Sequence, residues 1–321
     1  MQSEFEKLLE VRESDYKLHL SHVTHSLSCV SDIETSFRLH FVIPDASGEP
    51  RFRELARMLV TYITNYCFDA LKRRDLEETE RNQLFMEARD LFRDAETSGQ
   101  AGEMLVYFLM ESVLKAPQAL KKMPVTTNTK EDRKGSDGVH IKWDSKLEIL
   151  EILFAESKIL QSFSKALEKG FASIQGFRDS GGMRQHEMKL VTANFKILDS
   201  DLQAKVISYI DGENAPKTRL AQVCLIGFDW SEYKCLDDAR RQAFIEEFEA
   251  RYLSWAGNIV KQVEAGVKTF PHKQLRFDFF FLPFKDVQVF RDYFDDALRD
   301  VDGLHKYDSA IRANIPQPHR S

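Results

Sequence analysis

The sequence predicts an α/β fold, in which helices flank a mixed β-sheet and a mainly helical part precedes it. Nearly continuous apolar runs at residues 149–155 and 220–228 are typical of strands that are buried on both faces. Longer segments with apolar residues at helical spacing surround these runs, for example at 159–177 and 237–265. Helices that alternate with buried strands are expected to cover the two faces of one sheet.

The N-terminal third is expected to be mostly helical. Residues 1–35 are predicted to form a short amphipathic helix followed by polar sequence. A strand at 37–43 should stop at Pro44, because proline cannot donate a hydrogen bond to a neighbouring strand. Glycine and proline then predict a turn at 45–50. Three helices are expected next, at 51–74, 80–93 and 103–115.

The middle of the chain is predicted to supply three strands of the sheet. A first strand is expected at 125–128, after an irregular or edge segment that begins at Pro117. Residues 139–143 and 148–156 are predicted as two further strands, which a polar turn joins into a hairpin. The helix at 159–177 follows directly, so the hairpin and this helix should pack together.

The C-terminal part should complete the same sheet. The strand at 220–228 is rich in valine, isoleucine and leucine, and the helix at 237–265 has an amphipathic pattern. Residues 275–281 alternate between apolar and polar before the sequence becomes aromatic, which predicts a strand. A last helix is expected at 287–298.

Composition narrows the class of protein. Hydrophobic residues make up 43% and charged residues 30% of the 321 residues, which is ordinary for a globular protein. No apolar run reaches the roughly 18 residues of a membrane span, and the acidic N-terminus is unlike a signal peptide. The four cysteines lack CxxC spacing, which favours free thiols in a reducing compartment. We therefore expect a cytoplasmic protein. No Walker motif is present, so the chain should not hydrolyse ATP by itself.

Two short polar motifs at the predicted hairpin carry the clearest chemical signal. Asp137 precedes the first strand, and Glu156 and Lys158 end the second. Side chains two residues apart in a strand point to the same face, so Glu156 and Lys158 should lie together with Ser157 turned away. A hairpin would bring Asp137 to the same end. Two carboxylates and one ammonium group would then converge, and carboxylates suit a hard cation such as Mg²⁺.

The Glu-x-Lys pattern is not specific by itself, because such pairs are common on solvated faces of strands and helices. Here it follows a buried apolar run, and the carboxyl end of a buried strand is where a site in an α/β sheet is expected. Glu103 adds a further acid at the start of an apolar helix that should pack on the sheet. The alternative is that Glu103 only interacts favourably with the helix dipole.

Together these segments resemble a known family. The helix with Gly102 and Glu103, the strand after Asp137, the strand that ends in Glu156-Ser157-Lys158 and the aromatic segment 280–284 are similar to HamA. HamA is the nuclease subunit of the Hachiman anti-phage defence system and resembles PD-(D/E)xK nucleases. The similarity runs from about Phe37 to the helix around Phe294.

The resemblance implies a PD-(D/E)xK restriction-endonuclease-like core, metal-dependent DNA cleavage and a partner helicase that restrains the nuclease. The length would allow one large domain or two, and we expect a single domain over 1–321, with a helical N-terminal portion at 1–95 and the nuclease core with C-terminal elaborations at 96–321. The catalytic residues would be Glu103, Asp137, Glu156 and Lys158, and the three acids would bind Mg²⁺, for which Mn²⁺ should substitute.

Contacts with nucleic acid are expected to be local. The net charge of −6 argues against a surface that coats nucleic acid, but seven basic residues against four acids lie between Lys121 and Lys146. In the following helix, two lysines and a glutamine at spacing four would share one face. A solvated loop and a solvated helix face explain these patterns equally well. The candidate contacts are Lys134, Lys142, Gln161, Lys165 and Lys169.

Two other functions are compatible with the sequence. The same fold could be a catalytically inactive module that holds a helicase or nucleic acid, although the complete set of acids and lysine favours an enzyme. An unrelated α/β enzyme could instead use His140 as a general base. His19, His22 and His25 recur at spacing three, which could indicate a metal site, but neither a cysteine nor an acid completes the set nearby. Surface histidines are the simpler interpretation.

Overall fold

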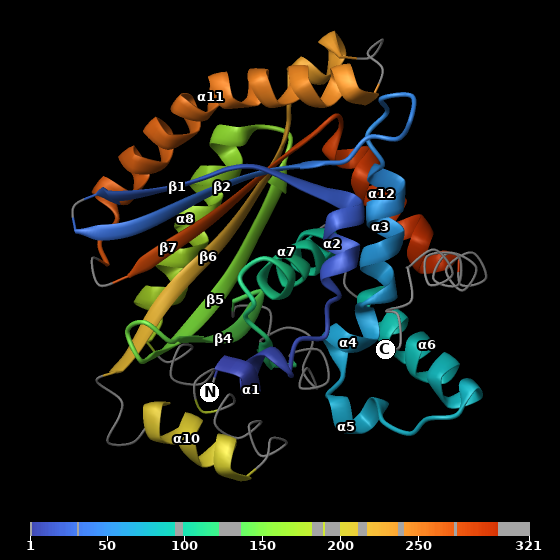
Figure 1. The fold of residues 1–321 in the computed structure, drawn as a ribbon, viewed down its shortest axis with the longest axis vertical. Helices are drawn as coiled ribbons and strands as arrows, with labels where there is room; N and C mark the ends of the chain where they lie inside the picture. Colours follow the sequence, from blue (N-terminus) through green and yellow to red (C-terminus); the bar gives the residue numbers. More distant parts are fainter. Residues whose placement is uncertain are drawn as a thin grey trace, which may run out of the picture.

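A mixed sheet of seven strands runs through the described part of the chain (Figure 1). The structure is a computed structural model, and it describes residues 2–30, 32–93, 99–121, 136–181, 189, 200–210, 217–236, 241–272 and 275–300. The strand order is β1-β2-β7-β6-β5-β4-β3. The strands are β1 (Leu20–Val30), β2 (Ile33–Val42), β3 (Gln118–Leu120), β4 (Gly138–Asp144), β5 (Ile149–Leu160), β6 (Thr218–Asp229) and β7 (Arg276–Phe284).

The four central strands are parallel to one another. β2 pairs with β7, β7 with β6 and β6 with β5, all in parallel, while β1, β4 and β3 are added in antiparallel pairs at the two sides. Parallel strands require apolar side chains on both faces, and β6 is buried almost throughout. The carboxyl ends of β2, β5, β6 and β7 therefore meet at one edge of the sheet, where sites in such sheets form.

Helices cover both faces of this sheet (Figure 1). Gly102 of α7 and Gly170 of α8 show which helix lies on which face. A Cβ atom at Gly102 would lie 2.8 Å from Ser157 Oγ, and one at Gly170 would lie 3.1 Å from Cys224 Sγ. Cys224 is the register partner of Glu156, and adjacent strand residues point to opposite faces. Hence α7 (Gln100–Ser112) and α8 (Phe163–Asp179) pack on opposite faces of β5.

The remaining helices extend these two layers. The long helix α11 lies on the side of α8, where Ser164 donates to Gln262 at 3.0 Å. Helix α3 packs against α7 and α12. Their bounds are α1 (Gln2–Glu6), α2 (Glu13–His19), α3 (Phe52–Thr61), α4 (Ile63–Cys67), α5 (Ala70–Arg73), α6 (Glu78–Arg93), α10 (Ser200–Ile210), α11 (Arg241–Thr269) and α12 (Val287–Arg299), with a 3-10 helix at Ser231–Cys235.

The predicted α/β class, with a mixed sheet and helices near the N-terminus, is confirmed. The expectation for the first 35 residues was wrong in part, because residues 20–30 form β1 rather than irregular polar sequence. β1 is the outer strand of the sheet, so its serine, threonine and histidine side chains remain accessible while its backbone pairs with β2. The helix expected at 51–74 is divided into α3, α4 and α5. The strand expected at 125–128 lies outside the described residues.

The aromatic segment at the end of β7 belongs to the core. Phe280, Phe281, Leu282 and Phe284 are all fully buried, so this segment offers no exposed apolar surface. Cys29, Cys67 and Cys224 are free thiols, as expected. None of the helices in the described ranges has both the length and the apolar character needed to cross a membrane.

Candidate active site

The hairpin of β4 and β5 forms as predicted, and its register determines which side chains meet. Gly138 pairs with Ala155, and the Asp137 amide donates to the Ala155 carbonyl oxygen at 2.8 Å. Asp137 therefore lies at the same end of the hairpin as Glu156. Beyond this point β5 continues to Leu160 and pairs with β6 alone, because β4 begins only at Gly138. The side of residues 156–160 that would face β4 is thus not covered by it.

The Asp137 carboxylate is held in a defined position. Its Oδ2 accepts hydrogen bonds from the Ser157 amide and from Ser157 Oγ, both at 2.7 Å. Ser157 itself faces α7, and the absence of a side chain at Gly102 lets the helix approach it closely. Ser157, which the motif treats as a spacer, therefore orients the catalytic candidate Asp137.

Glu156 and Lys158 lie together on the opposite face, beside α8. Lys158 Nζ donates to Glu156 Oε1, and Ser173 of α8 also hydrogen-bonds the Glu156 carboxylate. Only 7% of the Glu156 side chain is exposed, against 27% for Lys158. Helix α8 therefore shields Glu156 from water, while part of the Lys158 side chain remains accessible.

The electrostatics of the cluster reflect an excess of negative charge. Burial, and next the Asp137 charge, raise the pKa of Glu156 to about 7, although Lys158 partly offsets them. Burial alone would lower the pKa of Lys158, but the Glu156 and Asp137 carboxylates raise it above its ordinary value. The lysine therefore stays protonated, and two carboxylates share one ammonium group.

Glu103 reaches this cluster through Tyr66. Glu103 lies in the first turn of α7, and Tyr66 Oη is 3.4 Å from Glu103 Oε2. The same hydroxyl donates to the backbone carbonyl of Asp137 at 3.0 Å. Burial, and next the charge of Glu103, raise the pKa of Tyr66 well above its usual range, so the hydroxyl remains a donor. Glu103 thus lies on the α7 face, whereas Glu156 and Lys158 lie on the α8 face.

Tyr66 was not identifiable from the sequence. It belongs to the short helix α4 (Ile63–Cys67), where a buried aromatic residue is unremarkable as packing. Its role arises only because α4 and α7 bring its hydroxyl to the start of β4. The structure therefore pairs Glu156 with Lys158 directly and brings Asp137 near enough for its charge to affect both pKa values, while Tyr66 links Glu103 to the Asp137 backbone.

The residues expected to contact nucleic acid have different positions. Lys165 and Lys169 are exposed on α8, but Gln161 precedes the helix, which begins at Phe163, so the expected three-residue helical face is reduced to two lysines. Lys142 lies five residues along β4 from Asp137, roughly 16 Å away. Lys142 is therefore not beside the cluster. Lys134 lies outside the described residues.

His140 does not have the environment of a general base. Its side chain is fully buried, and Nδ1 lies 2.7 Å from the Ala116 carbonyl oxygen. Burial lowers the pKa of His140 to about 3, so the imidazole is neutral and shielded from substrate. The alternative of a histidine-based α/β enzyme is not supported by this geometry.

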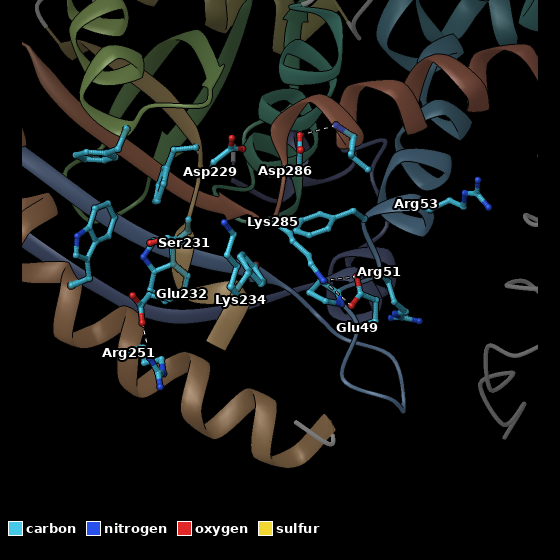
Figure 2. Close-up of a pocket in the computed structure, with 18 of the residues that line it drawn as sticks. Glu49, Arg51, Arg53, Asp229, Ser231, Glu232, Lys234, Arg251, Lys285 and Asp286 are labelled. Atoms are coloured by element: carbon cyan, nitrogen blue, oxygen red, sulfur yellow. Dashed lines mark hydrogen bonds and ion pairs between the residues drawn. The ribbon is translucent and has the colours of Figure 1, made fainter. Parts of the chain in front are cut away.

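A larger hollow lies elsewhere, at the carboxyl ends of β6 and β7, with a volume of about 1460 Å³ (Figure 2). None of the four catalytic candidates lines it. Its charged walls are partly self-paired, since Glu49 contacts Lys285 at 3.3 Å and Glu232 contacts Arg251 at 2.6 Å (Figure 2). The hollow lacks a concentration of positive charge that would favour nucleic acid. This hollow therefore has neither the catalytic candidates nor the charge expected of a nucleic-acid site.

The donor set at the hairpin suits a divalent cation. Asp137 and Glu156 are hard oxygen donors. Burial is the main cause of the raised pKa of Glu156 and the Asp137 charge is the second, and a cation near both carboxylates would offset these effects. Within the described ranges, no group of three or more histidine, cysteine, aspartate or glutamate side chains is gathered closely enough to hold a metal ion. Two carboxylates still fit Mg²⁺, which commonly keeps several waters and takes one or two protein carboxylates together with phosphate oxygens.

In the absence of a divalent cation, the contribution of Glu156 to stability should decrease as pH rises from about 4.5 to about 7. Because the folded-state pKa is raised, the folded protein binds more protons than the unfolded protein between these two pH values. The stabilisation is therefore complete below about pH 4.5 and is lost as the pH rises through about 7. The loss should be a few kcal/mol at most, because one pKa unit corresponds to about 1.4 kcal/mol.

Chemical denaturation with EDTA, at about pH 5 and about pH 8, measures this effect. The buried Glu111 also has a pKa of about 7 and contributes to any measured pH dependence, so the informative quantity is the difference between wild type and Glu156→Gln. Wild type should lose more stability than the variant between the two pH values. Equal losses would show that Glu156 titrates normally.

Comparison with known proteins identifies the family of this chain. No curated protein matches the sequence. The family profile described as HamA matches residues 17–298, which include both strands of the hairpin, α7 and α8. Because this match spans most of the chain, the chain belongs to the HamA family and is a component of the Hachiman defence system.

Proposed function

We propose that this HamA protein is a metal-dependent deoxyribonuclease, most simply an endonuclease, and the effector of the defence system. The observation that supports this proposal is the meeting of Asp137, Glu156 and Lys158 at the open end of the β4–β5 hairpin. The buried Glu156 carboxylate and the partly exposed Asp137 carboxylate lie near one ammonium group, and a bound cation explains this excess of negative charge better than a purely structural role does. Hydrolysis of a phosphodiester uses this combination of charges.

In the proposed reaction, water attacks the phosphorus atom of DNA and the bond to one bridging oxygen breaks. Asp137 and Glu156 would hold Mg²⁺, with Ser157 keeping the Asp137 carboxylate oriented. When bound, Mg²⁺ would supply positive charge to the phosphate oxygens. Lys158 would orient the attacking water and counter the negative charge that develops on the phosphate.

Glu103 would act at a distance from the reacting atoms. Its link through Tyr66 to the Asp137 carbonyl suits a residue that positions the start of β4 or orders a water near the cation.

The competing proposal is an inactive module that binds DNA or a helicase. The two proposals differ in the expected cleavage: an inactive module would bind its ligands but would not cut DNA when Mg²⁺ or Mn²⁺ is supplied.

Asp137→Asn, Glu156→Gln and Lys158→Ala should each reduce DNA cleavage to background, because each removes a charge that the reaction requires. Glu103→Gln should be milder, about 10- to 100-fold, as expected of a residue outside the direct ligands. The measurement is plasmid cleavage with Mg²⁺ or Mn²⁺, made on the assembled defence complex so that a missing partner does not hide the activity.

Glu168→Gln is a suitable control, since Glu168 is exposed on α8 and lies outside the cluster. Thermal melts should show that the variants remain folded. Cleavage at the wild-type rate by Lys158→Ala would remove this residue from the mechanism. An intact plasmid after incubation with the wild-type complex under activating conditions would favour the inactive module.

The proposed path of DNA follows one stripe of α8. Lys165 and Lys169 are spaced four residues apart, and Ser173, another four residues on, hydrogen-bonds Glu156. Residues at this spacing lie above one another on a helix. Two exposed ammonium groups would therefore lead along α8 toward the catalytic cluster, where they could neutralise phosphates on either side of the cut.

Replacing both Lys165 and Lys169 with alanine should weaken DNA binding at low salt. It should also reduce the slope of log affinity against log salt concentration by about 2, since each neutralised phosphate contributes roughly one unit. Fluorescence anisotropy with a Lys158→Ala background avoids cleavage during the titration. The matched control replaces Lys146 and Lys205, which are exposed and distant from the stripe. An unchanged slope in the α8 variant would place the DNA elsewhere.

A helicase of the same defence system is the proposed partner that delivers DNA. The net charge of −6, with only a local basic patch between Lys121 and Lys146, predicts that the isolated chain binds DNA weakly. Co-purification with the helicase, followed by cleavage assays with and without ATP, tests this proposal. Cleavage should depend on the helicase and on ATP or a loading end. Fast cutting by the isolated chain would contradict restraint by a partner while leaving the metal site unaffected.

A further inference from the structure

A second polar cluster, unrelated to the hairpin, lies on the face of β1 and β2. His22 pairs with His40, and His25 pairs with Arg38. A spacing of three residues would normally place His22 and His25 on opposite faces of a strand. The register shifts between His22 and Thr24, and this β-bulge returns His25 to the face of His22. The histidine pattern in the sequence therefore has a structural consequence that helical spacing did not reveal.

These side chains line a pocket of about 240 Å³ between the β1–β2 hairpin, α2 and the end of α7. His40 forms its buried floor, with 1% of the residue exposed, and its ring lies 5.2 Å from that of His22. His22 and His25 are exposed at the rim. The pocket therefore combines a fixed interior with an accessible entrance. Its remaining charged lining residues are Glu13, Lys17, Arg38 and Lys115.

The floor of the pocket contains polar atoms that the protein itself does not satisfy. In the described part of the chain, His40 Nε2 and Arg38 Nε are buried without a hydrogen-bond partner. His40 Nδ1 lies 3.4 Å from the Arg38 carbonyl oxygen, which can only accept, so in the neutral ring Nδ1 carries the hydrogen and Nε2 is a buried acceptor; Arg38 Nε is the buried donor. A buried donor without a partner is costly, and a bound acceptor would remove this cost.

The charges around the pocket favour an anion over a cation. Glu13 is the one acid among the lining residues, and it contacts both Lys17, at 2.7 Å, and Lys115, at 2.9 Å. One carboxylate therefore faces two ammonium groups. Arg38 adds a guanidinium group, which Asp278 contacts from behind the floor at 3.2 Å.

The pKa values of His25 and His40 are lowered first by burial and then by nearby positive charge. Burial and then the charge of Arg38 lower the pKa of His25, and burial followed by the neighbouring His22 lowers the pKa of His40. A metal cation would meet the same repulsion from Arg38 and the lysines. An anion would instead be attracted, and it could accept hydrogen bonds from Arg38 and from the imidazoles at the rim.

We infer that this pocket binds a phosphate group, carried either by the end of a nucleic-acid strand or by a small phosphate compound. Arg38 would donate to it from the floor, where His40 Nε2 could accept from a protonated phosphate oxygen, while His22, Lys17 and Lys115 would contact it at the rim. The volume is below the roughly 300 Å³ at which pockets begin to enclose drug-sized molecules, so the phosphate rather than a whole nucleotide would be enclosed. This inference does not depend on the proposed nuclease activity.

Inorganic phosphate is the first probe, titrated into the full-length protein in phosphate-free buffer and followed by calorimetry. Saturable binding to one site is expected. His22→Gln and Arg38→Lys should each weaken it about tenfold or more, because each removes a charge-assisted or directional hydrogen bond. Leu27→Gln is the control, since Leu27 is 63% exposed on the same strand and outside the pocket, and it should bind phosphate as wild type does.

Binding of two oligonucleotides of the same sequence, one with a 5′-phosphate and one with a 5′-hydroxyl, is then compared in the presence of EDTA. This comparison distinguishes the end of a nucleic-acid strand from a small phosphate compound as the source of the phosphate. Preference for the phosphorylated strand, lost in His22→Gln, identifies a nucleic-acid end. Equal binding of the two strands, with phosphate binding retained, identifies a small phosphate compound. The inference is overturned if phosphate does not saturate, or if folded His22→Gln and Arg38→Lys bind it as the control does. Zn²⁺ binding that requires His22 and His40, without phosphate binding, would overturn it as well.

Discussion

The register of the β4–β5 hairpin is the constraint on which the candidate site depends. Pairing of Gly138 with Ala155 places Asp137 at the level of Glu156. A slip by one residue would turn Glu156 and Lys158 toward α7 and Ser157 toward α8, since strand side chains alternate. The apolar residues on the two faces oppose such a slip. Val139 and Phe154 pack in the cluster that includes Phe177 of α8, whereas Ala155 packs with the core beneath α7.

The same register explains the electrostatic character of the site. It brings Asp137 close enough for its charge to raise the pKa of Glu156, and Lys158 partly offsets this effect. Ser157 satisfies one carboxylate by two hydrogen bonds, while Glu156 is buried against α8. The fold thus maintains an arrangement that is unfavourable for the cation-free protein. Such an arrangement is typical of a site that binds a cation and a phosphate, and not of one that stabilises the fold.

Much of this organisation could be predicted from local sequence. Buried strands such as β5 and β6 have apolar runs that few other structures tolerate, and period two is sufficient to place Glu156 beside Lys158. Tyr66 could not be predicted, because its contact with Asp137 depends on how α4 packs against the sheet. His22 and His25 share a face because of a β-bulge, and the residues of β1 do not predict this bulge. The three-helix division of residues 51–74 also depends on tertiary packing rather than on periodicity.

The central claim is that Asp137 and Glu156 form one cation site to which Lys158 is not a ligand. Calorimetric titration of the purified chain with Mn²⁺ at neutral pH tests it most directly, because the measurement needs neither DNA nor a partner. Wild type should bind Mn²⁺ saturably, Asp137→Asn and Glu156→Gln should both lose this binding, and Lys158→Met should retain it or bind more tightly. Mn²⁺ binding that survives in both carboxylate variants would contradict the account, since the cation would then lie elsewhere in the protein.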